Sequence, residues 1–212
     1  GDADIFTPNS SGGNRGFSVS FWVKLNSGAT ASQQIITKNG DWDSGAYHYE
    51  WKILSRFDSK PRMVVYGGDS DANFMSFTID TALAADQWYH IAFTWDLGST
   101  AAGWTAYLDG VKCTDGSGAT FLDGGTWSAV SNTINKLFLS RDLTQYGEMK
   151  LDEVSIWDDE IPESQIELIY NGGEPVSLNL MPIVQTYLVG WWRNGDGATY
   201  PTIPDDSEFY SN

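Results

Sequence analysis

The chain has 212 residues, of which 41% are hydrophobic and 14% aromatic, with one cysteine and a formal net charge of -16. This length and apolar content suit one all-β domain, the negative charge disfavours a nucleic-acid partner, and a single cysteine excludes an internal disulfide. No apolar run approaches the roughly 20 residues that a membrane-spanning helix needs, so we expect no membrane insertion.

A period of two between apolar and polar residues predicts strands along most of the chain. Residues 17–25 are the clearest case, with Phe17, Val19, Phe21 and Val23 in one phase. An Asp109-Gly110 pair between apolar runs predicts a hairpin with a two-residue turn, because both residues tolerate positive φ. The remaining strands are expected within residues 47–57, 61–68, 74–80, 87–96, 104–113, 136–142 and 150–158.

One segment on the C-terminal side is predicted to be helical. Pro162 suits a first helical position, and Gly172 with Gly173 provides a stop. The apolar stripe of this helix consists of Ile166, Ile169 and Tyr170. A helix of about ten residues is too short to stand alone, so it must dock on the sheet. The predicted fold is therefore all-β: a two-sheet antiparallel β-sandwich of the jelly-roll type with one short helix.

Five segments, in chain order, resemble the laminin-G-like group of the concanavalin A-like lectin/glucanase superfamily. They read FSVSFWVKL, IITKNG, QWYHIAFTWD, AYLDGVK and GEMKLDEVSIWDDEIPESQIELIYNGG. The resemblance covers residues 1–173, which we take as one domain. Residues 174–212 are expected to be an extension that adds a strand at about 187–192 and a loop-rich tail. That tail is similar to segments that adjoin such domains in phage and other virion-associated proteins.

Catalytic carboxylates are not expected. Glucanases of this superfamily place three carboxylates at alternate positions of one strand, all facing the cleft. Here strict alternation puts Asp152 on one face and Glu153 on the other, and neither face carries two carboxylates two positions apart. His90 falls where the resemblance implies a structural histidine. We therefore predict that the chain is not an enzyme.

Calcium is the preferred interpretation of Asp152. Alternation places this residue on the face of Val154 and Ile156, where a buried carboxylate needs a cation or several N–H donors. The resemblance implies a structural calcium ion held by Asp4 and Asp152, with backbone carbonyls from residues 11–14 or 145–148. The alternative is that Asp152 accepts backbone N–H groups and no metal is present.

A second calcium candidate is the spacing of Asp69, Asp71 and Asn73, which follows the first ligands of an EF-hand loop. Phe74 replaces the glycine that such a loop requires, and no helices flank it. A solvated hairpin loop is therefore the preferred interpretation of this stretch.

Ligand contact is predicted for aromatic residues in Gly-rich loops, because lectin-like sites stack aromatic rings on sugars. The candidates are Asp41, Trp42, Asp43, Tyr47 and Trp127. The alternative is that these tryptophans pack over the ends of the sandwich. Trp22, Trp88 and Trp95 lie within predicted strands and are expected to pack rather than to bind.

These observations predict a non-catalytic binding or adhesion module that recognises glycans or proteins on an extracellular or virion surface. The chain is expected to be part of a larger polypeptide or assembly. The first alternative is a structural virion or assembly domain whose edge strand pairs with a neighbour. A glycoside-active enzyme is the third.

Overall fold

The computed structural model describes residues 4–9, 13–27, 32–39, 49–67, 72–125, 127, 129–130, 136–141, 146–181, 186–194 and 206. The strands are β1 (Phe17–Leu25), β2 (Gln33–Asn39), β3 (Tyr49–Ser55), β4 (Pro61–Tyr66), β5 (Phe74–Ile79), β6 (Tyr89–Trp95), β7 (Trp104–Leu108), β8 (Val111–Asp115), β9 (Gly118–Asp123), β10 (Leu137–Leu139), β11 (Met149–Trp157) and β12 (Leu188–Trp192). The helix is α1 (Glu163–Tyr170), and short 3-10 turns are η1 (Asp4–Phe6), η2 (Ala101–Gly103), η3 (Asn171–Gly173) and η4 (Leu178–Leu180). None of the described helices is long and apolar enough to cross a membrane.

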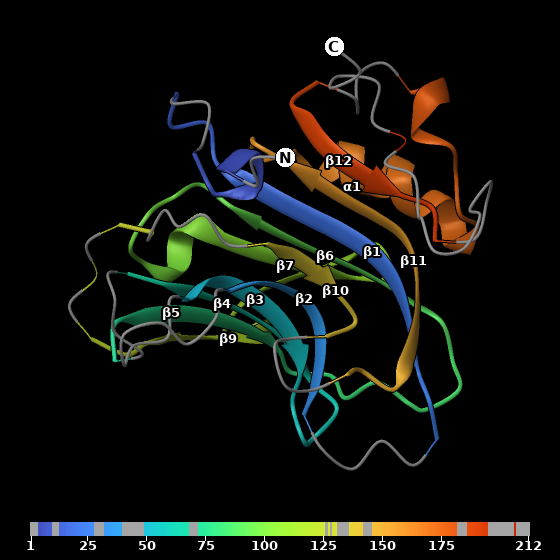
Figure 1. Ribbon diagram of the computed structural model, residues 1–212, viewed down its shortest axis with the longest axis horizontal. Helices are drawn as coiled ribbons and strands as arrows, with labels where there is room; N and C mark the ends of the chain where they lie inside the picture. Colours follow the sequence, from blue (N-terminus) through green and yellow to red (C-terminus); the bar gives the residue numbers. More distant parts are fainter. Residues whose placement is uncertain are drawn as a thin grey trace.

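The strands form one curled sheet in the order β10-β2-β3-β4-β5-β9-β8-β7-β6-β1-β11-β12. All neighbours are antiparallel except β8 and β9, which pair in parallel through Thr114 with Gly118 and Asp115 with Ala119. The sheet folds back so that its two halves face each other (Figure 1). The all-β fold with one short helix is therefore confirmed, and the curl is consistent with a jelly-roll sandwich. The division into two separate sheets is not confirmed, because β8–β9 pairing joins the halves.

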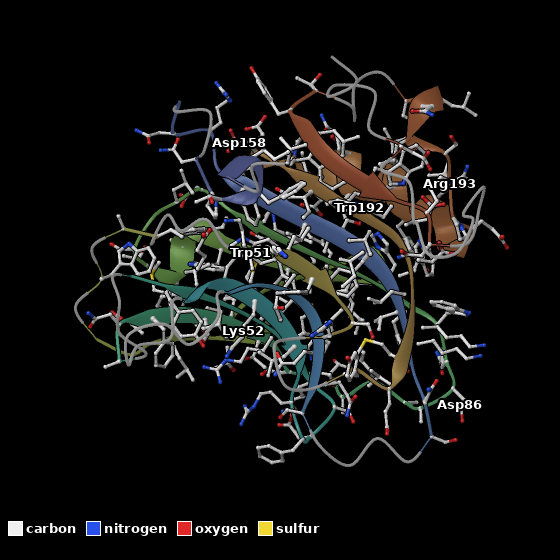
Figure 2. All side chains as sticks on the ribbon, viewed as in Figure 1. Trp51, Lys52, Asp86, Asp158, Trp192 and Arg193 are labelled. Atoms are coloured by element: carbon white, nitrogen blue, oxygen red, sulfur yellow. The ribbon has the colours of Figure 1, made fainter. Side chains whose placement is uncertain are left out.

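Aromatic side chains fill the space between the two halves. Phe17 of β1 meets Trp51 of β3 at 5.2 Å between ring centroids, and Phe77 of β5 stacks on Trp104 of β7 at 6.0 Å. Trp51 (Figure 2), Trp104 and their neighbours are almost completely buried. The predicted inward phase of β1 is correct, since Phe17, Val19, Phe21 and Val23 all belong to this core.

A second apolar cluster covers the outer face of β1, β6, β11 and β12. Helix α1 lies over this face (Figure 1) and inserts Ile166 and Ile169. They pack with Tyr107, Trp157 and Trp191, which point away from the inner core. Both faces of β1 are consequently buried over most of the strand. The docking predicted for the helix is thus observed, and it creates a covered outer face on this half of the sheet.

The helix differs from its prediction at both ends. Pro162 is the N-cap residue, with an extended backbone (φ -73°, ψ 159°), and is not the first helical residue. The helix has eight residues and ends at Tyr170, and its C-cap is Asn171, whose left-handed backbone (φ 47°, ψ 40°) precedes Gly172 and Gly173. An asparagine in this conformation stops a helix as a glycine does. The turn at Asp109 and Gly110 has positive φ at both residues, as predicted.

Candidate functional site

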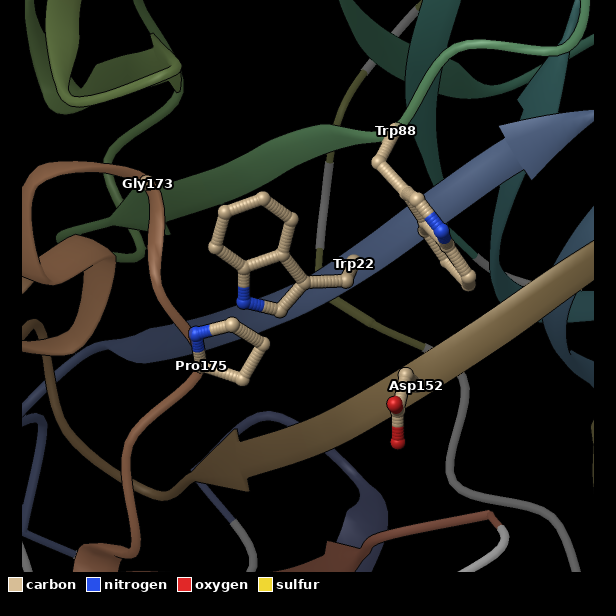
Figure 3. Close-up of a pocket in the computed structure, with 5 residues that line it drawn as sticks. All are labelled: Trp22, Trp88, Asp152, Gly173 and Pro175. Carbon is tan, nitrogen blue, oxygen red and sulfur yellow. The ribbon is translucent and has the colours of Figure 1, made fainter.

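A pocket of about 260 Å³ opens on the covered outer face, at the side of the C-terminal segment (Figure 3). Its lining residues are Trp22 of β1, Trp88 immediately before β6, Asp152 of β11, and Gly173 and Pro175 after α1. Two indole rings, a proline and one carboxylate therefore converge from four segments that lie far apart in the sequence. Trp22 and Trp88 were expected to pack only, so the structure brings together a site that the sequence analysis missed.

A β-bulge explains why Asp152 faces this pocket. Trp22 pairs with Asp152 and Ser20 pairs with Ser155, so β11 has one residue more than β1 between these pairs. Glu153 absorbs it with a positive φ of 48°. Alternation is thereby reset: Val154 and Ile156 enter the inner core, whereas Asp152 lies with Trp22 on the outer face. The prediction that Asp152 shares a face with Val154 and Ile156 is wrong for this reason.

Trp22 is fixed from below by two rings. Its indole lies 5.3 Å from the His90 ring and 6.1 Å from the Tyr170 ring, between centroids. Only 6% of Trp22 is exposed, so it forms the floor of the pocket and not a free platform. The helix end is thus tied to the strand beneath it, and the orientation of the indole is set by packing.

His90 lies beneath Trp22, completely buried. Its Nε2 and the Ser20 Oγ are 2.8 Å apart, and burial lowers its pKa to about 3. The imidazole is therefore neutral at physiological pH. Ser20 and His90 are both inaccessible to solvent. Their contact is therefore structural, and no substrate can reach it in this conformation.

Trp88 supplies the exposed aromatic surface, with 39% of the residue accessible. The loop before it is anchored by the Asp86 backbone N–H, which donates to the Leu25 carbonyl at 2.8 Å, and by the buried side chain of Leu83. In the view of Figure 3, the Trp22 ring is seen from its face and the Trp88 ring nearly from its edge, and Asp152 lies on the strand next to that of Trp22. The two rings thus form a corner rather than a flat surface.

The last wall of the pocket follows α1. Asn171, Gly172 and Gly173 all have left-handed φ values, of 47°, 66° and 105°. This run turns the chain back over β1 and places Gly173 and Pro175 against the pocket. Leu178 then anchors the segment in the outer cluster. The wall depends on residues that tolerate positive φ, for which asparagine and glycine are suited.

Glu153, the bulge residue, has a separate structural role. Trp191 Nε1 donates to its Oε2 at 2.6 Å and Arg193 Nε to its Oε1 at 3.2 Å. Burial raises the pKa of this carboxyl, although both hydrogen bonds act to lower it. Asp152 Oδ1 accepts the Glu153 backbone N–H at 2.9 Å. The bulge is therefore held by contacts from β12, which lies beyond β11 at the sheet edge.

The other predicted ligand residues are placed as follows. Trp127 is half-buried, packs on the inner core and meets Trp95 edge to face at 5.8 Å, an arrangement that favours packing over the end of the sandwich. Asn73 closes a loop, because its carbonyl accepts the Gly67 N–H. Asp41, Trp42, Asp43, Tyr47, Asp69 and Asp71 lie outside the described residues.

The structure leaves the calcium site as a prediction. Among the described residues, no three His, Cys, Asp or Glu side chains come together where they could hold a metal ion. The backbone of Asp4 belongs to η1, but its side chain is outside what the structure describes. The nearest described carboxylate in the chain, Glu153, is occupied by Trp191 and Arg193. An ion at Asp152 would therefore need Asp4 and the carbonyls of residues 11–14 or 145–148.

A signal for the missed residues is present in the sequence. Trp22 lies in the polar phase of β1, with Ser18 and Ser20, and Trp88 lies in the phase of His90 before β6. Large aromatics in the polar phase of two adjacent strands require a cover or a ligand. The wall at Gly173 and Pro175 had no such signal, because its position depends on the turn after α1.

Comparison with solved structures identifies similar folds at low sequence identity. A candidate carbohydrate-binding protein from Bacteroides ovatus is 15% identical at a TM-score of 0.57, over 91% of this chain and 50% of that chain. The receptor-binding domain of botulinum neurotoxin mosaic serotype C/D is 15% identical at 0.52, over 75% and 37%. The binding domain of botulinum neurotoxin DC, solved with rat synaptotagmin II, is 13% identical at 0.53, over 74% and 36%. The chain thus spans no more than half the length of these structures, and the likeness shows the fold alone.

Family comparison gives the more specific result. No curated protein matches the chain. A laminin-G-type family model, described as the concanavalin A-like lectin/glucanases superfamily, matches residues 1–167. The match covers more than three quarters of the 212 residues and confirms the resemblance seen in the sequence. The chain is a laminin-G-like member of the concanavalin A-like lectin/glucanases superfamily.

Proposed function

We propose that this chain is a non-catalytic binding module that holds a sugar ring in the pocket between Trp22 and Trp88. The observation that supports it is the convergence of two indoles and the Asp152 carboxylate on one pocket. A pyranose has apolar C–H faces that stack on aromatic rings and hydroxyls that donate to a carboxylate. The pocket offers both partners at once.

The size of the pocket favours one ring. Pockets for drug-sized ligands occupy about 300–1,000 Å³, and this one is about 260 Å³. Figure 3 shows Trp22 and Trp88 at an angle to each other with Asp152 nearby, so a ring stacked on either indole would have its edge near the carboxylate. We therefore expect recognition of one saccharide unit, with the rest of a glycan extending into solvent.

The comparisons support a binding role as a proposal. The family contains lectins by its description, and the similar structures include a candidate carbohydrate-binding protein and toxin receptor-binding domains. A protein ligand is the other class these neighbours suggest, since one was solved with synaptotagmin II. The convergence of two indoles with one carboxylate favours the glycan, because a pyranose offers both an apolar face and hydroxyl donors.

The experiment is a glycan array with the wild-type chain, Trp88→Ala and Phe57→Ala. Phe57 is 71% exposed and lies outside the pocket, so its removal is a matched loss of an exposed aromatic. We expect binding by wild type and Phe57→Ala, and a loss of roughly two- to tenfold for Trp88→Ala, because aromatic stacking contributes about 0.5–1.5 kcal/mol. Equal binding by all three would place the site elsewhere, and no binding to any sugar would reject the proposal.

Calcium and location are further proposals that rest on the sequence. A structural calcium ion at Asp4 and Asp152 predicts a melting midpoint that falls when EDTA is added, and no such fall in Asp152→Asn. An ion present at about 100 times its Kd would add roughly 2.7 kcal/mol. An unchanged midpoint would reject it. We also retain an extracellular or virion surface as the predicted location.

A further inference from the structure

Two lysines lie directly beside the pocket on the same outer face. Lys24 of β1 pairs with Lys150 of β11, two residues along each strand from the pair formed by Trp22 and Asp152. The two pairs are separated by about 7 Å along the strands. Lys24 is half-buried and Lys150 is exposed. The bulge at Glu153 lies beyond Asp152, so it does not alter the phase of Lys150.

This arrangement is unfavourable unless a ligand uses it. Like charges directly opposite each other destabilise a sheet, and the chain has 12 basic residues against 28 acidic ones with which lysines could have paired. Within the part of the chain that the structure describes, neither Lys24 nor Lys150 forms an ion pair. Their ammonium groups are thus unmatched by any described carboxylate.

Protection of a sheet edge explains at most one of the two lysines. Lysines often guard exposed edge strands against pairing with other chains. Lys150 lies outside the described β11–β12 ladder, which spans Val154–Trp157 of β11, so it fits that role. Lys24 lies on β1, between β6 and β11, and a solvated face would also be served by opposite charges. The described contacts therefore do not explain why two lysines face each other.

We propose that Lys24 and Lys150 bind an anionic substituent, a carboxylate or a sulfate ester, on the saccharide whose ring occupies the pocket. This inference rests on the function proposed above and names the class of its ligand. The next row of side chains lies about 7 Å along the strands from the indole corner, within reach of a substituent on the rim of a pyranose ring stacked there. The ammonium groups then contact the anion by charge-assisted hydrogen bonds.

The surrounding residues fix the direction of the ligand. Val23 pairs with Tyr89 on β6, so Trp88, one residue earlier, flanks Lys24 on the outer face. Without a bound cation, the Asp152 carboxylate repels an anion and accepts hydroxyl donors. The ring hydroxyls therefore face Asp152, and the substituent lies over Lys24 and Lys150. The opposite orientation would place two negative groups together.

The test compares matched sugars that differ in one substituent. The gluco, galacto and manno pyranosides are each titrated as the neutral sugar, the uronate and the 6-sulfate, with binding followed by NMR of the indole N–H signals. We expect at least one ring to bind as an acidic form roughly fivefold or more tightly than as the neutral form. The carboxylate and sulfate arms tell the two anion sources apart.

Variants locate the effect. Lys24→Gln with Lys150→Gln removes the pair, and Lys136→Gln is the control, an exposed lysine before β10 on the other half of the sheet. The double variant is expected to lose the preference for the acidic sugar and to keep binding of the neutral one, whereas the control keeps both. Equal binding of acidic and neutral sugars by wild type would overturn this inference while leaving the pocket intact. If no sugar binds, the proposed function fails with it.

Discussion

Asp152 and Trp22 are partners across the β1–β11 ladder, and both face outward, whereas Val154 faces the inner core. One extra residue, Glu153, separates these two environments. Without the bulge, Asp152 and Val154 would share a face. The candidate site therefore owes its Asp152 carboxylate to a local irregularity in a strand that is otherwise regular.

The buried ion pair between Lys38 and Glu50 gives the first prediction. Its atoms are 2.6 Å apart, and both side chains are completely buried. Thr7 also donates to Glu50, which ties the N-terminal segment to β3. Lys38→Met is expected to lower the free energy of unfolding by about 3–5 kcal/mol, because it leaves a buried charge unpaired. Urea denaturation measures this.

Two controls make that prediction specific. Lys112→Met breaks an exposed pair with Glu163, at 3.0 Å, and should cost less than about 1 kcal/mol. Lys38→Met with Glu50→Leu should be less destabilised than Lys38→Met alone, since no charge is left unpaired. If the double variant loses as much stability as Lys38→Met and Glu50→Leu lose together, the pair does not act as a unit.

His90 gives a pH dependence. Burial lowers its pKa to about 3, against about 6.5 in the unfolded chain, so the unfolded state binds more protons between these values. The contribution of neutral His90 to the free energy of unfolding is fully present above about pH 6.5. It is lost as the pH falls toward 3, and the total loss is on the order of 5 kcal/mol. The His90→Gln variant should show a flatter pH profile in urea denaturation.

NMR provides the direct check on His90. Its ring proton signals, assigned by their absence in His90→Gln, should not titrate between pH 5 and pH 8. A midpoint near the ordinary histidine pKa would mean that the ring is accessible and that Trp22 and Tyr170 do not seal it.

Glu153 has the opposite dependence on pH. Its pKa is raised, chiefly by burial, so the protonated carboxyl is the form that folding favours. Its contribution is present below the unfolded pKa and is lost as the pH rises through the folded pKa. Relative to wild type, Glu153→Gln should therefore gain stability between pH 4 and pH 7. Glu148→Gln, an exposed position just before β11, should show no such trend. Parallel profiles for both variants would contradict this.

The edge of the sheet supplies a prediction about assembly. The Asp206 N–H donates to the Trp191 carbonyl of β12 at 2.7 Å, and β12 is one of the two edge strands. Deletion of residues 195–212 exposes that acceptor, and we expect concentration-dependent self-association in light scattering. Asp206→Pro, which removes the N–H together with the side-chain carboxylate, should have a smaller effect than the deletion. Two monomeric variants would argue against pairing through this edge.

The sequence predicts what repeats with a regular period. The inward phase of β1, the Asp109-Gly110 turn and the amphipathic face of α1 follow from local residue patterns, and all are observed. It does not predict where the period changes. The bulge at Glu153 is stabilised by Trp191 and Arg193, which lie about 40 residues later, and no local feature of residues 150–158 announces it. The parallel pairing of β8 with β9 joins the two halves of the sheet, and strand patterns alone cannot predict that pairing.

The candidate site also joins a predictable part to an unpredictable one. The residue type and the strand of Asp152 identify it as a candidate. The prediction of its face and its neighbours is wrong, because both depend on the bulge. Trp22 and Trp88 were assigned to packing since periodicity cannot reveal which outer-face aromatics a helix leaves uncovered. The pocket is defined by the end of α1, and its shape depends on tertiary contacts.

The position of the final wall has a consequence for how specificity changes. Gly173 and Pro175 line the pocket, but the family match ends at residue 167. The floor thus lies within the residues that the family model matches, and the rim lies just after them. Two proteins with the same domain could select different saccharides by exchanging a handful of residues after the helix, without altering a strand.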